Sequence, residues 1–295
     1  RRVLFRSRVA ADLALDVPVR IVASPPEASG VFGDALPVWP LGEDVWADPG
    51  RPRDSNCRAV IAAIERAVSA TQSGEIAGVV TNPIHKAVLS RSGFAHPGHT
   101  EFLAALAGVP RTVMMLAADE LRVVPVTIHA PLASIPRLLT TDLIVETGLI
   151  CADGLKRYFG LERPRLAVCG LNPHAGEEGT IGGEERTVIA PAVERLRAQG
   201  LAVSGPHPAD TLFMKAARER YDAALCMYHD QALIPIKTLA GERAVNVTLG
   251  LPFVRTSPDH GTAFDIAGQG KADPSSLVAA IELAAAMAGR AKASG

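Results

Sequence analysis

The sequence has few cysteines, few aromatic residues and no excess of charge of either sign. Its cysteines, Cys57, Cys151, Cys169 and Cys226, lie far apart and form no CxxC pair, which excludes a disulfide framework or a structural zinc knuckle. The 30 basic side chains are matched by 31 acidic ones, and this balance argues against a general nucleic-acid binder. No apolar run approaches the roughly 18–20 residues of a membrane span. The absences predict a reduced, soluble, cytoplasmic globular protein.

Several common enzyme signatures are also missing. The chain contains no GxGxxG, GxxxxGK[ST], GxSxG or HExxH motif. A Rossmann dinucleotide site, a P-loop ATPase, an elbow-type serine hydrolase and a zincin therefore lose their usual sequence support. The 48% hydrophobic content over 295 residues still predicts one or two substantial cores and excludes a disordered chain.

The hydrophobic pattern alternates between short β-branched runs and longer amphipathic stretches. Strands are expected over residues 17–23, 76–81, 111–116, 121–128, 165–169, 223–228 and 244–249. Helices are expected over residues 59–72, 141–159, 184–199, 208–221 and 275–290. Alternation of this kind predicts an α/β fold with a largely parallel sheet covered on both faces.

Three of the expected strands end in histidine, at His129, His174 and His229. Ligands of open α/β sheets gather where strands end at their carboxyl side, and neutral imidazoles are good ligands for zinc and similar divalent ions. Asp210 and Asp230 could add a carboxylate. The alternative is three ordinary loop histidines, with Asp210 as a helix cap and Asp230 as a solvated charge.

A second set of residues has the chemistry of an anion site. His99 and Thr100 stand near an expected helix start, where free backbone N–H groups and the helix dipole favour a phosphate or carboxylate. Lys237, Asn246 and Arg255 follow later in a chain with only six lysines. A cationic side chain with a hydroxyl and an amide makes a phosphate clamp. The alternative is scattered surface charge.

The ordered motifs resemble one enzyme family. The segments TNPIHKAVL, PGHTEF, CGLNPHAGEEG, GPHPADT, MYHDQALIPIK and VNVTLGLPFVRTSPDHGTAFDIAGQGKAD are similar in order and distance to those of the PdxA family of 4-hydroxythreonine-4-phosphate dehydrogenases. DHGTAFDIAG also resembles the adenine-binding loop of isopropylmalate dehydrogenases. The resemblance covers about residue 10 to the C-terminus.

The resemblance implies a two-domain α/β/α fold of the isopropylmalate dehydrogenase type, with a mostly parallel sheet and a cleft between the domains. Residues 1–100 with 245–295 are expected to form the cofactor-side domain, and residues 101–244 the central domain with the metal ligands and dimer contacts. The family's opening strand and GDPAGIGPE-type turn have no counterpart in the sequence. The first βα unit is therefore expected to be missing.

The resemblance also implies the activity and the site. It implies NAD- or NADP-dependent oxidation of 4-phosphooxy-L-threonine and decarboxylation to 3-amino-2-oxopropyl phosphate, on the route to pyridoxal phosphate, by a homodimer with its site near the interface. One divalent metal ion (Zn, Co or Mg) is expected at the three histidines. The further expectations fall into three groups: His99, Thr100, Lys237, Asn246 and Arg255 for the substrate, His260, Gly261, Thr262, Asp265 and Gly268 for the cofactor, and Lys237 and Asp210 for proton transfer.

Other functions remain open within the same architecture. The chain could oxidise a 4-phosphoerythronate, a phosphothreonate or a carboxylated dihydrodiol. Phosphate acyltransferases share the fold but need no three-histidine metal site. A truncated, non-catalytic binding remnant is the alternative from another class.

Overall fold

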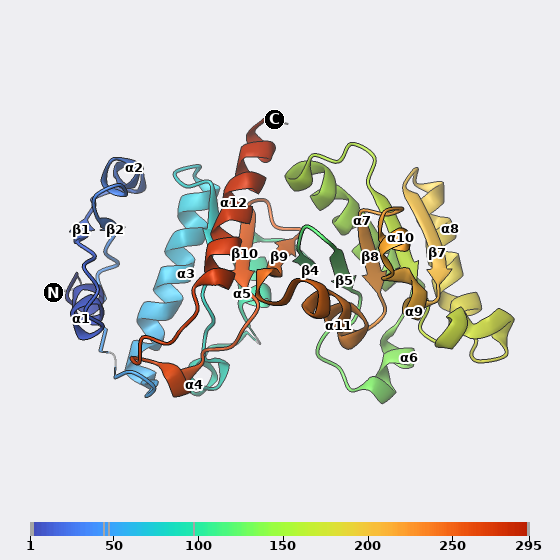
Figure 1. Cartoon of the computed structure of the whole chain (residues 1–295), viewed down its shortest axis with the longest axis horizontal. Coiled ribbons are helices and arrows are strands. Elements are labelled where there is room, and N and C mark those ends of the chain that lie inside the picture. The colour runs from blue at the N-terminus through green and yellow to red at the C-terminus, as the bar shows by residue number, and fades with distance from the viewer. Residues whose placement is uncertain (1–2, 44, 47, 97, 294–295) are drawn as a thin grey trace. The chain divides into compact units, whose positions relative to one another are not determined.

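The structure is a computed structural model that describes residues 3–43, 45–46, 48–96 and 98–293 (Figure 1). Contacts within the chain divide it into two units, Arg1–Pro110 with His260–Pro274, and Arg111–Asp259 with Ser275–Gly295. These boundaries differ from the expected division near residues 100 and 245. The strands and helix after residue 244 belong largely to the second unit, because they pair and pack with its other elements. The roles expected of the two parts remain predictions.

Most elements of the first unit are short, with α3 the longest. Its helices are α1 (Val3–Asp12), α2 (Ala28–Val31), α3 (Cys57–Gln72), α4 (Lys86–Arg91) and α5 (His99–Ala107), and its strands are β1 (Val19–Ile21), β2 (Leu36–Val38) and β3 (Gly78–Val80). Strands β1 and β2 pair in parallel. Cys57, Val88 and Leu89 form a buried cluster between α3 and α4.

The second unit holds a large sheet and the longer helices. Its strands are β4 (Val113–Ala117), β5 (Arg122–Pro125), β6 (Arg165–Cys169), β7 (Ala202–His207), β8 (Ala223–Cys226), β9 (Val245–Leu249) and β10 (Val254–Pro258). Its helices are α6 (Ile135–Leu138), α7 (Thr141–Phe159), α8 (Ala190–Ala198), α9 (Ala209–Leu212), α10 (Lys215–Arg218), α11 (His229–Ala240) and α12 (Ser275–Ala293). Within this unit the strands are hydrogen-bonded in the order β10-β9-β4-β5-β8-β6-β7.

The sheet of the second unit has a parallel and an antiparallel half. Strand β8 pairs in parallel with both β5 and β6, and β6 pairs in parallel with β7. Strand β4 pairs antiparallel with β5 and β9, and β9 pairs antiparallel with β10. Helices pack on the strands as expected of a covered sheet, with α11 against β5 and β8 and with α7 beside α8 and α12. The predicted α/β class is confirmed.

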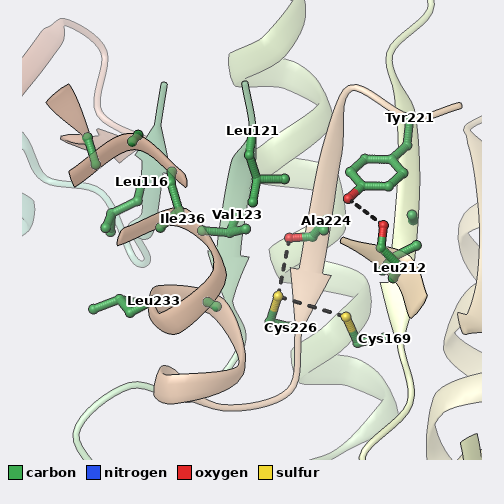
Figure 2. Close-up of a cluster of buried hydrophobic side chains, with 14 residues drawn as sticks. Leu116, Leu121, Val123, Cys169, Leu212, Tyr221, Ala224, Cys226, Leu233 and Ile236 are labelled. Atoms are coloured by element: carbon green, nitrogen blue, oxygen red, sulfur yellow. Dashed lines mark hydrogen bonds between the residues drawn. The ribbon is translucent and has the colours of Figure 1, made fainter. Parts of the chain in front are cut away.

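A buried cluster joins α11 to the sheet (Figure 2). Leu233 and Ile236 of α11 pack against a cluster that includes Leu116 of β4 and Val123 of β5. The strands are apolar on successive residues, as sheets covered on both faces require. Cys169 and Cys226 also lie in this cluster, with their sulfur atoms 3.9 Å apart. All four cysteines are free thiols.

Several elements differ from the sequence-based expectation, among them α11, where no helix was expected. Strands β7 and β10 were not among the expected strands, and their sequences AVSGPH and VRTSP contain glycine, proline and polar residues. The helix expected over residues 208–221 is instead two short helices, α9 and α10, that are separated at Phe213 and Met214. No helix in the described part of the chain is long and apolar enough to cross a membrane.

Candidate functional site

The three predicted metal histidines follow three neighbouring strands. His129 comes after β5, His229 begins α11 after β8, and His174 comes after β6. The sheet order places β8 between β5 and β6, with all three parallel. Parallel strands end at the same edge of a sheet, so the segments that carry the histidines leave the sheet side by side.

His129 and His229 lie next to each other. Their ring centroids are 5.8 Å apart. The Nδ1 atom of His229 is 2.7 Å from Oδ1 of Asp230, and a carboxylate on one imidazole nitrogen orients the ring and leaves Nε2 to bind a metal. Asp230 therefore supports the His229 ring in addition to adding charge.

His174 lies on an unusual turn. Residues 174–178 all have positive φ angles, between 42° and 78°, and four of the five are not glycine. Such left-handed conformations cost an L-residue roughly 1–2 kcal/mol each, so neighbouring contacts must hold this turn. The His174 side chain itself is exposed.

The three histidines do not form a complete metal site within the single chain. Among the described residues, no group of three or more His, Cys, Asp or Glu side chains is gathered so that it could hold a metal ion. The structure thus brings together His129 and His229, and not His174 with them. Coordination by all three histidines stays a prediction.

The predicted substrate residues Asn246 and Arg255 share one face of the antiparallel half. Arg255 of β10 lies opposite Thr248 of β9, because Thr256 pairs with Val247 and Ser257 with Asn246. Its Nη1 atom donates to Oγ1 of Thr248 at 2.8 Å. The residue is 3% exposed, and burial lowers the pKa of its guanidinium to about 10. Arg255 therefore remains a cation at neutral pH.

Lys237 forms an ion pair that the sequence did not predict. It lies in the last turn of α11, and its Nζ atom is 2.8 Å from Oδ2 of Asp259, the residue that follows β10. The Lys237 side chain is half-exposed, while that of Asp259 is largely buried. An ammonium group carries three donors, so the pair with Asp259 leaves Lys237 able to bind an anion.

The remaining predicted residues lie on shorter segments. His99 and Thr100 begin α5, as expected, and both are partly buried. Asp210 lies in the first turn of α9 and is exposed. His260, Gly261, Thr262, Asp265 and Gly268 lie in the segment His260–Pro274 of the first unit. There the ring of Phe264 lies 5.1 Å from that of His85.

The sequence analysis did not identify three buried polar residues that lie next to the histidine segments. Thr127, Glu185 and Gln231 are each less than 9% exposed. Thr127 and Gln231 stand two residues from His129 and His229, and this proximity was the only sequence signal. Glu185 follows His174 by 11 residues, so its relation to that histidine is visible only in the folded chain.

Comparison with known proteins identifies a family. The profile of the family described as "Pyridoxal phosphate biosynthetic protein PdxA" matches residues 2–284. A relative from Bradyrhizobium diazoefficiens, named 4-hydroxythreonine-4-phosphate dehydrogenase, is 59% identical over 280 residues, which is 93% of this chain and 81% of the relative. One of the same name from Methylorubrum extorquens is 57% identical over 293 residues, 97% of this chain and 84% of the relative.

Solved structures agree with the sequence comparison. The 4-hydroxythreonine-4-phosphate dehydrogenase of Klebsiella pneumoniae superposes with a TM-score of 0.88 at 40% identity, covering 96% of this chain and 86% of that one. A terephthalate 1,2-cis-dihydrodiol dehydrogenase from Burkholderia xenovorans has a TM-score of 0.65 at 28% identity, covering 97% and 87%. The fold is thus shared by dehydrogenases with different substrates.

Proposed function

Because the chain belongs to the PdxA family of pyridoxal phosphate biosynthetic proteins, we propose that it oxidises 4-phosphooxy-L-threonine with NAD or NADP. The oxidised product loses carbon dioxide to give 3-amino-2-oxopropyl phosphate. The observation that carries this proposal is the 59% identity to a 4-hydroxythreonine-4-phosphate dehydrogenase over most of both chains.

The pair His129 and His229 fits a divalent metal ion. Two imidazoles that share an ion at roughly 2.0–2.1 Å hold their rings about 5 Å apart, close to the observed 5.8 Å. We propose His174 as the third ligand. A zinc, cobalt or magnesium ion there would act as a Lewis acid toward the substrate hydroxyl and the ketone formed from it. Asp230 keeps the His229 ring in a binding orientation through its contact with Nδ1.

The substrate's phosphate requires cations and polar donors. We assign this role to Lys237, Asn246 and Arg255, with His99 and Thr100. Arg255 suits it because its charge is fixed in place by burial and by Thr248. Contacts to the phosphate hold the reacting carbon in position for transfer. Lys237 or Asp210 would move the proton of the hydroxyl.

The segment with His260, Gly261, Thr262, Asp265 and Gly268 is proposed to bind the nicotinamide cofactor, which accepts the hydride. Its resemblance to an adenine-binding loop supports this role. The segment carries the aromatic ring of Phe264, which lies 5.1 Å from that of His85. Adenine rings stack on aromatic rings of this kind.

A homodimer is proposed, with each site near the interface. Large apolar side chains are exposed on the segments that follow the three histidines, at Leu132, Ile181 and Ile234, and Met214 is exposed near Asp210. Exposed apolar side chains that form a contiguous patch mark interaction surfaces, and we propose that these four side chains contribute to one. A two-fold interface here would bring Asp210 of one chain toward the histidines of the other. Light scattering with a dimer mass at micromolar concentration is the expected result.

A turnover assay tests the proposed activity. Purified protein is mixed with 4-phosphooxy-L-threonine, NAD or NADP, and each of Zn²⁺, Co²⁺ and Mg²⁺, and the reduced nicotinamide is measured by absorbance. We expect turnover that a chelator abolishes and that the same metal restores. Absence of turnover with every pairing would contradict the proposal.

One other substrate class has specific support. The structural similarity to the terephthalate dihydrodiol dehydrogenase favours a carboxylated dihydrodiol as the second candidate. Both substrate classes need an anion site and a hydroxyl to oxidise. The assay should therefore include a carboxylated dihydrodiol and 4-phosphoerythronate, and the substrate with the highest kcat/KM decides between them.

A further inference from the structure

A buried hydrogen-bond network joins the three strand ends that carry the histidines. Gln231 lies at its centre, in the first turn of α11, and is 8% exposed. Its side-chain oxygen accepts from the backbone N–H of Met227 at 2.6 Å, and its side-chain nitrogen donates to the carbonyl of Gly170 at 2.8 Å. One amide therefore links the end of β8 to the end of β6.

The residue that follows β8, Met227, is also hydrogen-bonded to the segment that follows β5. The hydroxyl of Thr127 donates to the carbonyl of Met227 at 2.7 Å, and the Thr127 N–H points to the same oxygen at 3.3 Å. Met227 thus has its N–H fixed by Gln231 and its carbonyl fixed by Thr127. Thr127 and Met227 each stand two residues before a histidine, His129 and His229 respectively.

Glu185 completes the network on the β6 side. One carboxylate oxygen accepts the N–H groups of Leu171 and Asn172, both at 2.7 Å, and the other accepts from the Asn172 side chain at 3.0 Å. Asn172 stands two residues before His174. The loop closes tightly around this carboxylate, because a Cβ atom at Gly176 would lie 2.5 Å from Glu185.

We infer that Thr127, Gln231 and Glu185 are positioning residues for metal binding. Thr127 and Gln231 fix the segments of His129 and His229 relative to each other, and Glu185 fixes the backbone that leads into the His174 turn. This inference rests on the proposed metal site at His129, His174 and His229. Each network residue anchors the chain two to four residues before a histidine, while none of the three is itself a ligand. Buried amides and carboxylates are costly to leave unpaired, so the contacts specify one arrangement of the loops.

Gln231→Met tests the centre of the network, because methionine has a similar volume and neither hydrogen-bonding group. The protein is freed of metal with a chelator and titrated with Co²⁺ alone, whose visible absorption reports binding and coordination geometry. Ile236→Val, on the same helix and fully buried, is the matched control for loss of stability. We expect Gln231→Met to weaken Co²⁺ binding about 10- to 100-fold and to alter the spectrum, while Ile236→Val binds as the wild type does.

Thr127→Val gives a second measurement should Gln231→Met fail to fold. It removes one hydroxyl with little change in shape, and we expect Co²⁺ affinity to fall by about 3- to 10-fold, with Thr127→Ser restoring it. Wild-type affinity and spectrum in folded Gln231→Met or in Thr127→Val would overturn the inference and leave the metal site standing. A wild-type protein that binds no Co²⁺ would instead overturn the proposed metal site, and the inference with it.

Discussion

The two halves of the large sheet present their polar residues in different ways. In the parallel half, the candidate residues lie beyond the strands, on the segments that follow β5, β8 and β6. In the antiparallel half, Asn246 and Arg255 lie within paired strands. A strand fixes its side chains directly, whereas a loop needs supporting contacts. The histidines have such support in the buried network, and Arg255 lies within a strand and donates to Thr248 opposite it.

His229→Ala should have the largest effect, and it tests the parallel half as the reacting centre. Losing one of the paired imidazoles removes Lewis-acid stabilisation worth several kcal/mol, so we expect kcat/KM to fall by about 100- to 1,000-fold. His207→Ala is the matched control, because this histidine ends the edge strand β7 and contacts Ser204. An equal loss of kcat/KM in His229→Ala and His207→Ala would contradict the assignment of the reacting centre to the parallel half.

Arg255→Ala tests the antiparallel half as the anion site. Loss of a charge-assisted contact worth about 1.5–3 kcal/mol should raise KM for the phosphorylated substrate by about 10- to 150-fold. Arg122→Met removes another arginine whose pKa is lowered by burial, on β5, against Phe159. It should lower the melting temperature and leave KM unchanged. An unchanged KM in Arg255→Ala would refute the assignment.

Sequence patterns predicted the strand ends of the parallel half better than the long-range contacts that join them. The apolar runs before His129, His174 and His229 marked three strand ends, and the helix expected over residues 141–159 matches α7. Strands β7 and β10 were missed because glycine, proline and arginine weaken a strand pattern that pairing with neighbours overrides. The contacts of Gln231 with Gly170, and of Lys237 with Asp259, join residues distant in sequence, which periodicity does not report.

Asp222→Asn tests the starts of the parallel strands, at the end away from the histidines. We expect this end to contribute to stability and not to activity. Asp222, just before β8, binds the side chain and backbone N–H of Arg165 at the start of β6. Burial would raise the pKa of Asp222, but the hydrogen bonds from Arg165 outweigh it and the pKa is lowered from 3.8. The stabilisation is therefore present above about pH 3.8 and lost as pH falls through the lower, folded-state pKa.

We expect Asp222→Asn to reduce the free energy of unfolding by about 1–2 kcal/mol near pH 7 and by less near pH 3, as measured by urea denaturation. Asp153→Asn is the control, since Asp153 pairs with Arg157 at 3.9 Å on an exposed helix face and should change stability by less than about 0.5 kcal/mol. KM and kcat should be unchanged in both variants. An equal loss of the free energy of unfolding near pH 7 and near pH 3 would contradict the ion pair between Asp222 and Arg165.

Ala175→Gly should have the smallest effect, and it measures how firmly the His174 turn is held. Ala175 has a φ of 52°, a left-handed conformation that glycine adopts without the penalty of a Cβ. The greater freedom of glycine in the unfolded chain offsets part of this gain, so we expect a net stabilisation of about 0.5–1 kcal/mol. Ala286→Gly, at an exposed position within the right-handed helix α12, should instead destabilise by about 1 kcal/mol. Opposite signs in the two variants establish that the turn is left-handed in solution, because the same chemical change helps only where φ is positive. If both variants destabilise equally, the loop carrying His174 has a different backbone from the one described, and the support that Glu185 gives it must be reassigned.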